Sequence, residues 1–314
     1  NYHFDEIACE YLLGKGMDPR FVDYLSTYKW NGSMYAMPEG CVAYPHEPMV
    51  RIECDAVGAF LIETHLLQLM NFNSLITTQA TRITRAASAA GGVMEFGTRR
   101  AQGLTAGLQG ARAAILGGCT GTANCLAEIM YGGPVVAVGT VSHAWVMLFP
   151  TEWDAFKALA DIYPDNVSLL IDTYNIFESG VINAIKVDDY LIEKYPNDPD
   201  KRVKSVRIDS GDLASGAKRL RKMFDMAGKP YIKIIVSNAL KESTVESLVS
   251  IQKAPINGFG IGENLITASE CPVFGGVYKL VAVKQEDGTY RSTMKCSDTL
   301  AKAIIPGYKT VYRL

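Results

Sequence analysis

Val206-Arg-Ile-Asp-Ser-Gly-Asp212 decides the fold of this chain, because a hydrophobic run there ends in charged and hydroxyl residues and a helical pattern follows at once. The same order recurs along the chain, which predicts repeated units of a strand, a polar strand end and a helix. The other predicted polar strand ends lie within 93–100, 135–143, 168–175, 232–238 and 258–264.

Strand ends at intervals of roughly 30 to 40 residues are typical of βα units in a parallel sheet. We therefore predict an α/β barrel, whose active site lies at the carboxyl ends of its strands. The run 113–116, just before Gly117-Gly118, is expected to add a further strand, for about seven in all.

The two ends of the sequence have a different pattern. Residues 1–30 look helical, and residues 32–54 form short strand-like runs broken by Pro38, Pro45 and Pro48. Two helices, 57–70 and 74–90, are expected next. After Pro272 the pattern is again strand-like, with a hairpin turn at Asp287-Gly288. We predict a β-rich flanking domain of 1–72 plus 270–314, and a barrel of 73–269. Because the sequence starts with Asn1 and stops at Leu314, we expect a fragment that is incomplete at both termini.

Composition restricts the classes of function. Of the 314 residues 48% are hydrophobic, which is enough for a large core, and a net charge of −2 gives no field for nucleic acid or an anionic membrane. The seven cysteines form no C-x-x-C pair, so we expect reduced thiols. We recognise no membrane span or signal peptide in the sequence. The expected location is the cytoplasm.

His143 is one of four histidines and follows a predicted strand, beside Thr140 and Ser142. A neutral imidazole at a strand end can move a proton or accept a phosphoryl group. The alternative is a histidine that is hydrogen-bonded for structural reasons.

Arg207, Asp209 and Asp212 place a guanidinium and two carboxylates in one short stretch. Alternation along a strand puts Arg207 and Asp209 on the same side. Arginine can bind a planar carboxylate through two hydrogen bonds, although a self-contained ion pair with aspartate is an equal alternative. Asp212 could instead cap a helix.

Three further strand ends have residues that suit phosphate. Arg99 and Arg100 suggest an anion clamp, although a basic surface pair is also possible. Ser237-Asn238 and the Gly258-x-Gly-x-Gly262 tip suggest backbone N–H groups close to an oxyanion. The glycine pattern alone is weak, because it lacks the P-loop lysine and does not begin a Rossmann unit. In the turn 117–124, tight packing explains the glycines as readily as ligand contact.

Several motifs in order resemble those of nicotinate phosphoribosyltransferases, over nearly the whole chain. They are Asn71-Phe-Asn-Ser-Leu-Ile-Thr, Glu95-Phe-Gly-Thr-Arg-Arg-Ala-Gln-Gly103, Gly139-Thr-Val-Ser-His-Ala144, Arg207-Ile-Asp-Ser-Gly-Asp-Leu213, Val236-Ser-Asn238 and Gly275-Gly-Val-Tyr-Lys-Leu-Val281. The resemblance implies the irregular α/β barrel of type II phosphoribosyltransferases with a β-rich flanking domain. It also implies transfer of phosphoribose from phosphoribosyl pyrophosphate to nicotinate, with coupled ATP hydrolysis, in NAD salvage. The expected assembly is a homodimer with a shared active site.

The resemblance also implies roles for individual residues. His143 would be transiently phosphorylated by ATP, Arg207 would hold the nicotinate carboxylate, and Asp209 would be catalytic. Mg²⁺ would neutralise the pyrophosphate, with Asp209 or Asp172 in support. The remaining expected substrate-binding residues are Arg99, Arg100, Thr140, Ser142, Ser237, Asn238, Gly260 and Gly262.

Two departures from the family pattern leave alternatives open. Family members commonly have an earlier N-terminal segment with an aromatic residue over the nicotinate ring, and we expect this chain to lack it. Many also read Gly-x-Gly-Thr where this chain has Gly260-Ile-Gly-Glu263, so either the backbone N–H of Glu263 or the residue Asn264 would replace the threonine. The alternatives are a phosphoribosyltransferase for nicotinamide or quinolinate, and an incomplete chain that only binds phosphorylated ligands.

Overall fold

The computed structural model describes residues 3–295 and 304–312, and these divide into two compact units. The flanking unit contains Asn1–Met70 and Gly275–Leu314, and the α/β unit is Asn71–Phe274. The sequence placed these boundaries after 72 and before 270.

A six-stranded parallel sheet forms the centre of the α/β unit, in the order β4-β3-β8-β7-β6-β5. This sheet, with helices between successive strands, confirms the predicted α/β class. The strands are β3 (Gly92–Glu95), β4 (Gly121–Thr122), β5 (Val167–Leu170), β6 (Val203–Ile208), β7 (Lys233–Val236) and β8 (Gly258–Ile261).

Two of the strands predicted for the α/β unit are wrong. Residues 113–116 belong to the helix α4 (Leu104–Leu116), because an alanine-rich run favours helix and places Ala111 and Ala114 in the core. The strand of that region is β4, in the glycine-rich turn. The predicted strand at 135–140 is reduced to one parallel bridge between Ala137 and Thr122, since β4 has only two residues to pair with it.

The sheet curls, so that its two edges approach each other at the carboxyl ends of the strands. His143 follows the bridge at one edge and Thr173 follows β5 at the other, yet His143 Nδ1 lies 3.1 Å from Thr173 Oγ1. The result is an incomplete barrel whose polar strand ends face one another.

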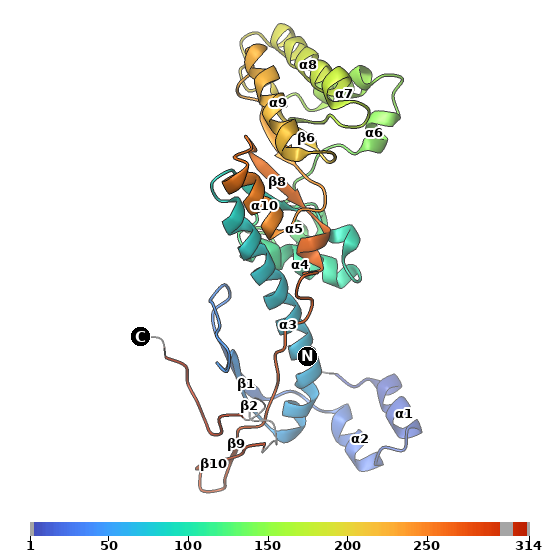
Figure 1. Cartoon of the computed structure of the whole chain (residues 1–314). Helices are drawn as coiled ribbons and strands as arrows, with labels where there is room; N and C mark the ends of the chain where they lie inside the picture. The colour runs from blue at the N-terminus through green and yellow to red at the C-terminus, as the bar shows by residue number, and fades with distance from the viewer. Residues whose placement is uncertain (1–2, 296–303, 313–314) are drawn as a thin grey trace. The chain divides into compact units, whose positions relative to one another are not determined.

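Helices cover this sheet, and α7 and α8 pack side by side (Figure 1). Strand residues such as Val206, Ile234 and Phe259 have no exposed surface. Besides α4, the helices of this unit are α5 (Cys125–Tyr131), α6 (His143–Met147), α7 (Glu152–Ile162), α8 (Val181–Lys194), α9 (Leu213–Met226), α10 (Glu242–Glu246) and α11 (Glu263–Ile266). Short 3₁₀ or π turns are η1 (Thr98–Arg100), η2 (Ile176–Gly180) and η3 (Ser247–Ile251).

In the described part of the flanking unit, two short helices and two antiparallel hairpins precede or follow the start of a long helix, α3 (Ala56–Ala87). Arg51 donates to the carbonyl of Lys309 at 2.9 Å and lies over the Tyr308 ring, so the C-terminal segment packs on the first hairpin. Asp287-Gly288 forms the expected turn between the last two strands. The elements are α1 (Glu6–Gly14), α2 (Pro19–Ser26), β1 (Gly32–Ala36), β2 (Val50–Cys54), β9 (Ala282–Lys284) and β10 (Tyr290–Ser292).

The long helix α3 (Ala56–Ala87) begins in the flanking unit and ends in the α/β unit. The sequence predicted two helices there, with a break near 71–73. The break does not form, because neither glycine nor proline occurs between Gly58 and Ala87. No described helix is long and apolar enough to cross a membrane.

A buried ion pair is expected to stabilise the α/β unit. Lys229 Nζ lies 2.6 Å from the fully buried Asp188, which also accepts from the Val203 N–H. Lys229→Met leaves this carboxylate uncompensated, so the free energy of unfolding should fall by about 3 to 5 kcal/mol in urea titrations. Lys157→Met, at an exposed pair with Asp161, should cost less than about 1 kcal/mol. Equal effects of the two variants would contradict the prediction.

Candidate active site

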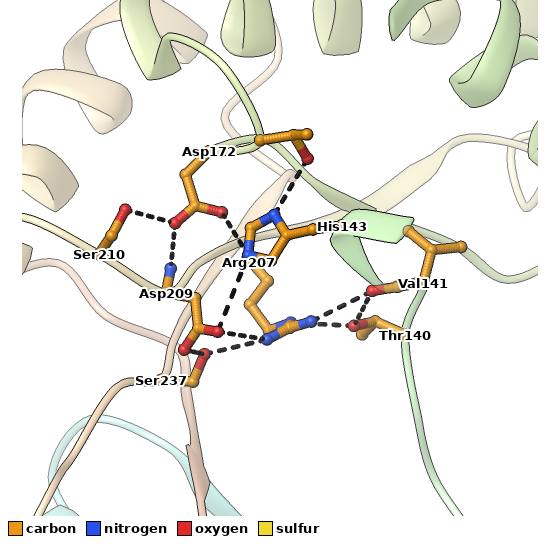
Figure 2. Close-up of polar contacts among 9 residues, drawn as sticks. Thr140, Val141, His143, Asp172, Arg207, Asp209, Ser210 and Ser237 are labelled. Atoms are coloured by element: carbon orange, nitrogen blue, oxygen red, sulfur yellow. Dashed lines mark hydrogen bonds and ion pairs between the residues drawn. The ribbon is translucent and has the colours of Figure 1, made fainter. Parts of the chain in front are cut away.

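A cluster of polar side chains occupies the carboxyl ends of β5, β6 and β7, together with the segment that precedes α6 (Figure 2). Arg207 is the last but one residue of β6, and Asp209 follows that strand. The structure brings together Thr140, His143, Asp172, Arg207, Asp209 and Ser237, all of them expected from the sequence.

The Arg207 guanidinium is held from two sides. Nε donates to Thr140 Oγ1 at 2.9 Å and Nη2 donates to the Val141 carbonyl at 3.1 Å, while Nη1 donates to Ser237 Oγ at 3.1 Å. Its side chain is 12% exposed, and this burial lowers the pKa of the guanidinium against the opposing effect of Asp209 and Asp172. Because arginine keeps its charge even so, the site holds a fixed, largely desolvated cation.

Asp209 does not close a tight pair with Arg207. The distance from Arg207 Nη1 to Asp209 Oδ2 is 3.6 Å, and Asp209 Oδ1 instead accepts a hydrogen bond from the Ser237 hydroxyl at 2.7 Å. Arg207 and Asp209 therefore form a loose ion pair without a direct hydrogen bond, and the cation can still attract an anionic ligand.

Asp172 supports the backbone of the β6 strand end. Its Oδ2 accepts from the Asp209 N–H at 2.8 Å and from the Ser210 hydroxyl at 2.7 Å. The side chain is 1% exposed, and Oδ1 has no hydrogen-bond partner within the described residues. Such a buried carboxylate oxygen is costly to leave unsatisfied, which makes it a candidate ligand for a cation.

His143 is the first residue of α6 and projects into the cluster. Nδ1 forms a hydrogen bond with Thr173 Oγ1. Nε2 lies 3.9 Å from Asp172 Oδ1 and 4.0 Å from Asp209 Oδ2. The imidazole is 44% exposed and can therefore be reached by a ligand. Ser142 Oγ accepts from the Trp145 N–H as the cap of α6, so its acceptor role is structural.

The strand end after β7 is strained. Ser237 is 5% exposed and bonds to both Arg207 and Asp209, whereas Asn238 and Ala239 have φ of 101° and 43°. Such positive φ values are unusual for residues other than glycine and often occur at functional sites.

Asp212 caps the helix α9, which was the alternative interpretation of this residue. Its side chain accepts from the N–H groups of Ala214 and Ser215.

A second group of residues lies at the ends of β3 and β8. Glu95 is fully buried, and its carboxylate accepts from the Gly97 N–H and from Thr122 Oγ1, the latter at 2.6 Å. Burial raises the pKa of the Glu95 carboxyl, against the effect of these two hydrogen bonds. The contact fixes the turn that begins η1, and so places Arg99 and Arg100.

The side chains of Asn264 and Glu263 both have partners within the chain. Asn264 Nδ2 donates to the Ala239 and Leu240 carbonyls, so the amide is engaged in structure. Glu263 Oε2 lies 3.6 Å from Arg100 Nη1, and both side chains are more than half exposed. Arg100 is thus partly neutralised in the chain.

Gly260 and Gly262 are required by packing. A Cβ on Gly260 would lie 2.5 Å from the Phe96 ring, and one on Gly262 would lie 3.0 Å from the Phe96 carbonyl. In the turn 117–124, a Cβ on Gly117 would lie 2.5 Å from Ala80. Glycine here allows close contact between neighbouring elements, so a phosphate contact is not needed to explain it.

Sequence reasoning gave no role to Thr173 or Glu95 and missed the structural role of Asn264. Thr173 and Glu95 each lie at or next to a polar strand end that the sequence did identify. Their position at a strand end was the one feature of the sequence that could have indicated a role. It does not define the role, because a hydroxyl or carboxylate at a strand end can face either a ligand or its own backbone.

Comparisons with known proteins identify the family of the chain. A family model for the nicotinate phosphoribosyltransferase N-terminal domain matches residues 1–71, and one for the nicotinate phosphoribosyltransferase family matches residues 92–302. The chain therefore belongs to the nicotinate phosphoribosyltransferase family. The nicotinate phosphoribosyltransferase of Bacillus subtilis is 40% identical over 315 residues, which cover 100% of this chain and 62% of that protein.

Solved structures show the same fold. Human nicotinic acid phosphoribosyltransferase matches with a TM-score of 0.75 and 27% identity, over 83% of this chain and 62% of that one. The nicotinate-nucleotide pyrophosphorylase of Pyrococcus furiosus matches with a TM-score of 0.64 and 27% identity, over 87% and 71%. The chain thus spans less than two thirds of the length of the Bacillus subtilis and human proteins.

The pair of Arg100 with Glu263 generates a prediction for anion binding. Glu263→Gln removes a carboxylate beside the candidate phosphate site, so inorganic pyrophosphate should bind about two- to fivefold more tightly in low-salt calorimetry. Because exposed charges are screened, the gain should shrink in 0.5 M salt, a concentration at which the Debye length is roughly 4 Å. Glu270→Gln, at the pair with Lys241, serves as the control. Weaker binding by Glu263→Gln would show that Glu263 helps to hold the anion.

Proposed function

We propose that this chain carries the active site of a nicotinate phosphoribosyltransferase. The enzyme joins the ring nitrogen of nicotinate to the anomeric carbon of phosphoribosyl pyrophosphate, releasing pyrophosphate and forming nicotinate mononucleotide for NAD salvage. The observation that carries the proposal is the desolvated Arg207 cation, which lies beside His143 and two aspartates at the strand ends. Membership of the family supports the same reaction.

Arg207 selects an acidic pyridine base. A buried guanidinium pairs strongly with a carboxylate, whereas a neutral amide cannot offer that charge. Nicotinamide would favour an acceptor for its NH₂ group, and Val141 supplies no such side chain. Quinolinate has two carboxylates, whereas Arg207 is a single cation, held by Thr140, Val141 and Ser237.

Catalysis depends mainly on charge and position. As pyrophosphate leaves, the ribose becomes oxocarbenium-like, and Asp209 lies at the cluster to stabilise this developing positive charge. Arg99, Arg100 and the backbone at Ser237 and Asn238 bind the phosphates. Thr140 and Ser142 help to position the substrate, and Thr140 does so through Arg207.

His143 couples ATP hydrolysis to this transfer. Its imidazole accepts the terminal phosphoryl group of ATP, ADP leaves, and the phosphohistidine is later hydrolysed. Partial exposure of the ring and its contact with Thr173 suit a positioned nucleophile that ATP can reach.

Asp172 and Asp209 would hold Mg²⁺ together with substrate phosphates. Within residues 3–295 and 304–312 no group of three or more His, Cys, Asp or Glu side chains is placed to hold a metal. Magnesium, however, commonly needs only one or two carboxylates when phosphates and water complete its shell. The unpartnered Asp172 Oδ1 fits this requirement. Bound magnesium supplies neutralisation of the pyrophosphate charge.

The assembly and location also belong to the proposal. We expect a cytoplasmic homodimer whose subunits share each active site, in keeping with the family resemblance. Size-exclusion chromatography with light scattering measures the assembly directly, and a monomer at all concentrations would exclude it.

Pyridine mononucleotide formation tests the activity. Nicotinate, nicotinamide and quinolinate are compared with phosphoribosyl pyrophosphate and Mg²⁺, with and without ATP. We expect product from nicotinate, increased by ATP. Preference for another base would overturn the role of Arg207. Product only from a longer version of the chain would mean that these residues bind phosphorylated ligands without completing the reaction.

Loss of the guanidinium should reduce use of nicotinate. For Arg207→Met we expect kcat/KM with nicotinate to fall at least about 30-fold, because truncating one side of a desolvated charged contact costs about 2 kcal/mol or more. The exposed Arg219→Met is the control. Unchanged kinetics in Arg207→Met would contradict the assignment.

ATP hydrolysis should depend on His143. In the absence of a pyridine base, the His143→Ala variant should lose its ATPase activity, because no side chain remains to accept the phosphoryl group. His65→Ala, at an exposed histidine of α3, should keep it. ATPase activity is measured as the release of inorganic phosphate. Steady activity in His143→Ala would exclude a phosphohistidine at this position.

A further inference from the structure

The turn that follows β7 has a conformation that needs support. Asn238 and Ala239 both have positive φ, and Ala239 in particular gains nothing from the left-handed region because its side chain cannot form a local hydrogen bond. Two consecutive residues of this kind persist only where neighbouring groups fix the backbone.

Asn264, in the first turn of α11, provides that support. Its Nδ2 donates to the Ala239 carbonyl at 2.9 Å and to the Leu240 carbonyl at 3.1 Å. Its own Oδ1 accepts from Ser269 Oγ at 3.0 Å, which fixes the orientation of the amide. The strand end after β7 is therefore tied to the strand end after β8 by one side chain.

The strained turn adjoins the residue that organises the cluster. Ser237, directly before it, accepts from Arg207 and donates to Asp209. We therefore expect a change in the backbone at 238–240 to displace this hydroxyl, and with it the guanidinium and the carboxylate that it joins.

We infer that Asn264 is a positioning residue, which holds the strained turn 238–239 and thereby keeps Ser237 between Arg207 and Asp209. The kinetic consequence rests on the proposed function, but the structural one does not. Among the described residues, the Asn264 amide bonds to the Ala239 and Leu240 carbonyls and to no side chain of the cluster, so we expect its effect to pass through the backbone.

Amide hydrogen exchange of residues 237–241 in the whole chain tests the structural part. Asn264→Ala should speed exchange on the order of tenfold, as the loss of two hydrogen bonds of ordinary strength predicts. Ser269→Ala removes only the contact to Oδ1 and should have a smaller effect. Adding Ala239→Gly to Asn264→Ala should slow exchange again, because glycine adopts positive φ without strain.

Kinetics separate this role from a general loss of stability. In Asn264→Ala the KM for nicotinate should rise about fivefold, while the thermal midpoint stays near that of Ser269→Ala, and Ala239→Gly should restore the KM. If the unaltered chain forms no mononucleotide, the proposed function fails and hydrogen exchange alone decides the inference. Unchanged exchange in Asn264→Ala, or faster exchange that Ala239→Gly does not slow, would overturn it.

Discussion

The buried guanidinium of Arg207 is the constraint on which the rest of the site depends. Arginine keeps its charge in a protein interior, so the chain must surround it with acceptors. Thr140 and Val141 supply them from one segment and Ser237 from another, while Asp209 offers charge at a longer distance. This arrangement joins the segment before α6 to β6 and β7, and it leaves the cation unneutralised by a close ion pair.

The curled sheet makes this possible. With β6 between β5 and β7, the polar residues that end the three strands lie next to one another, and His143 closes the group from the opposite edge. The second group, at β3 and β8, is built differently. There the buried Glu95 orders the backbone and the exposed Arg100 pairs with Glu263, so the charges remain near solvent.

Much of this could be predicted from the sequence, because parallel strands bring their carboxyl ends to one edge. That rule alone predicts that the strand ends with His143, Asp172, Arg207, Asp209 and Ser237 converge, whereas the roles expected of these residues came mainly from the family resemblance. Other features depend on contacts that a linear pattern does not specify. The helix over 113–116 follows from alanine propensity, but the apolar run alone resembled a strand. The engagement of Asn264 with the 239–240 backbone depends on a strained turn that no residue pattern announces.

The central claim is that the Arg207 guanidinium receives the carboxylate of the pyridine base. Titration of the chain with nicotinate, followed through the ¹⁵N resonance of Arg207 Nε, tests it most directly. The structure predicts a saturable shift with nicotinate and a much weaker response to equal concentrations of nicotinamide. The claim would be contradicted if nicotinate shifted other resonances of the chain, which shows that it binds, but left the Arg207 resonance unchanged.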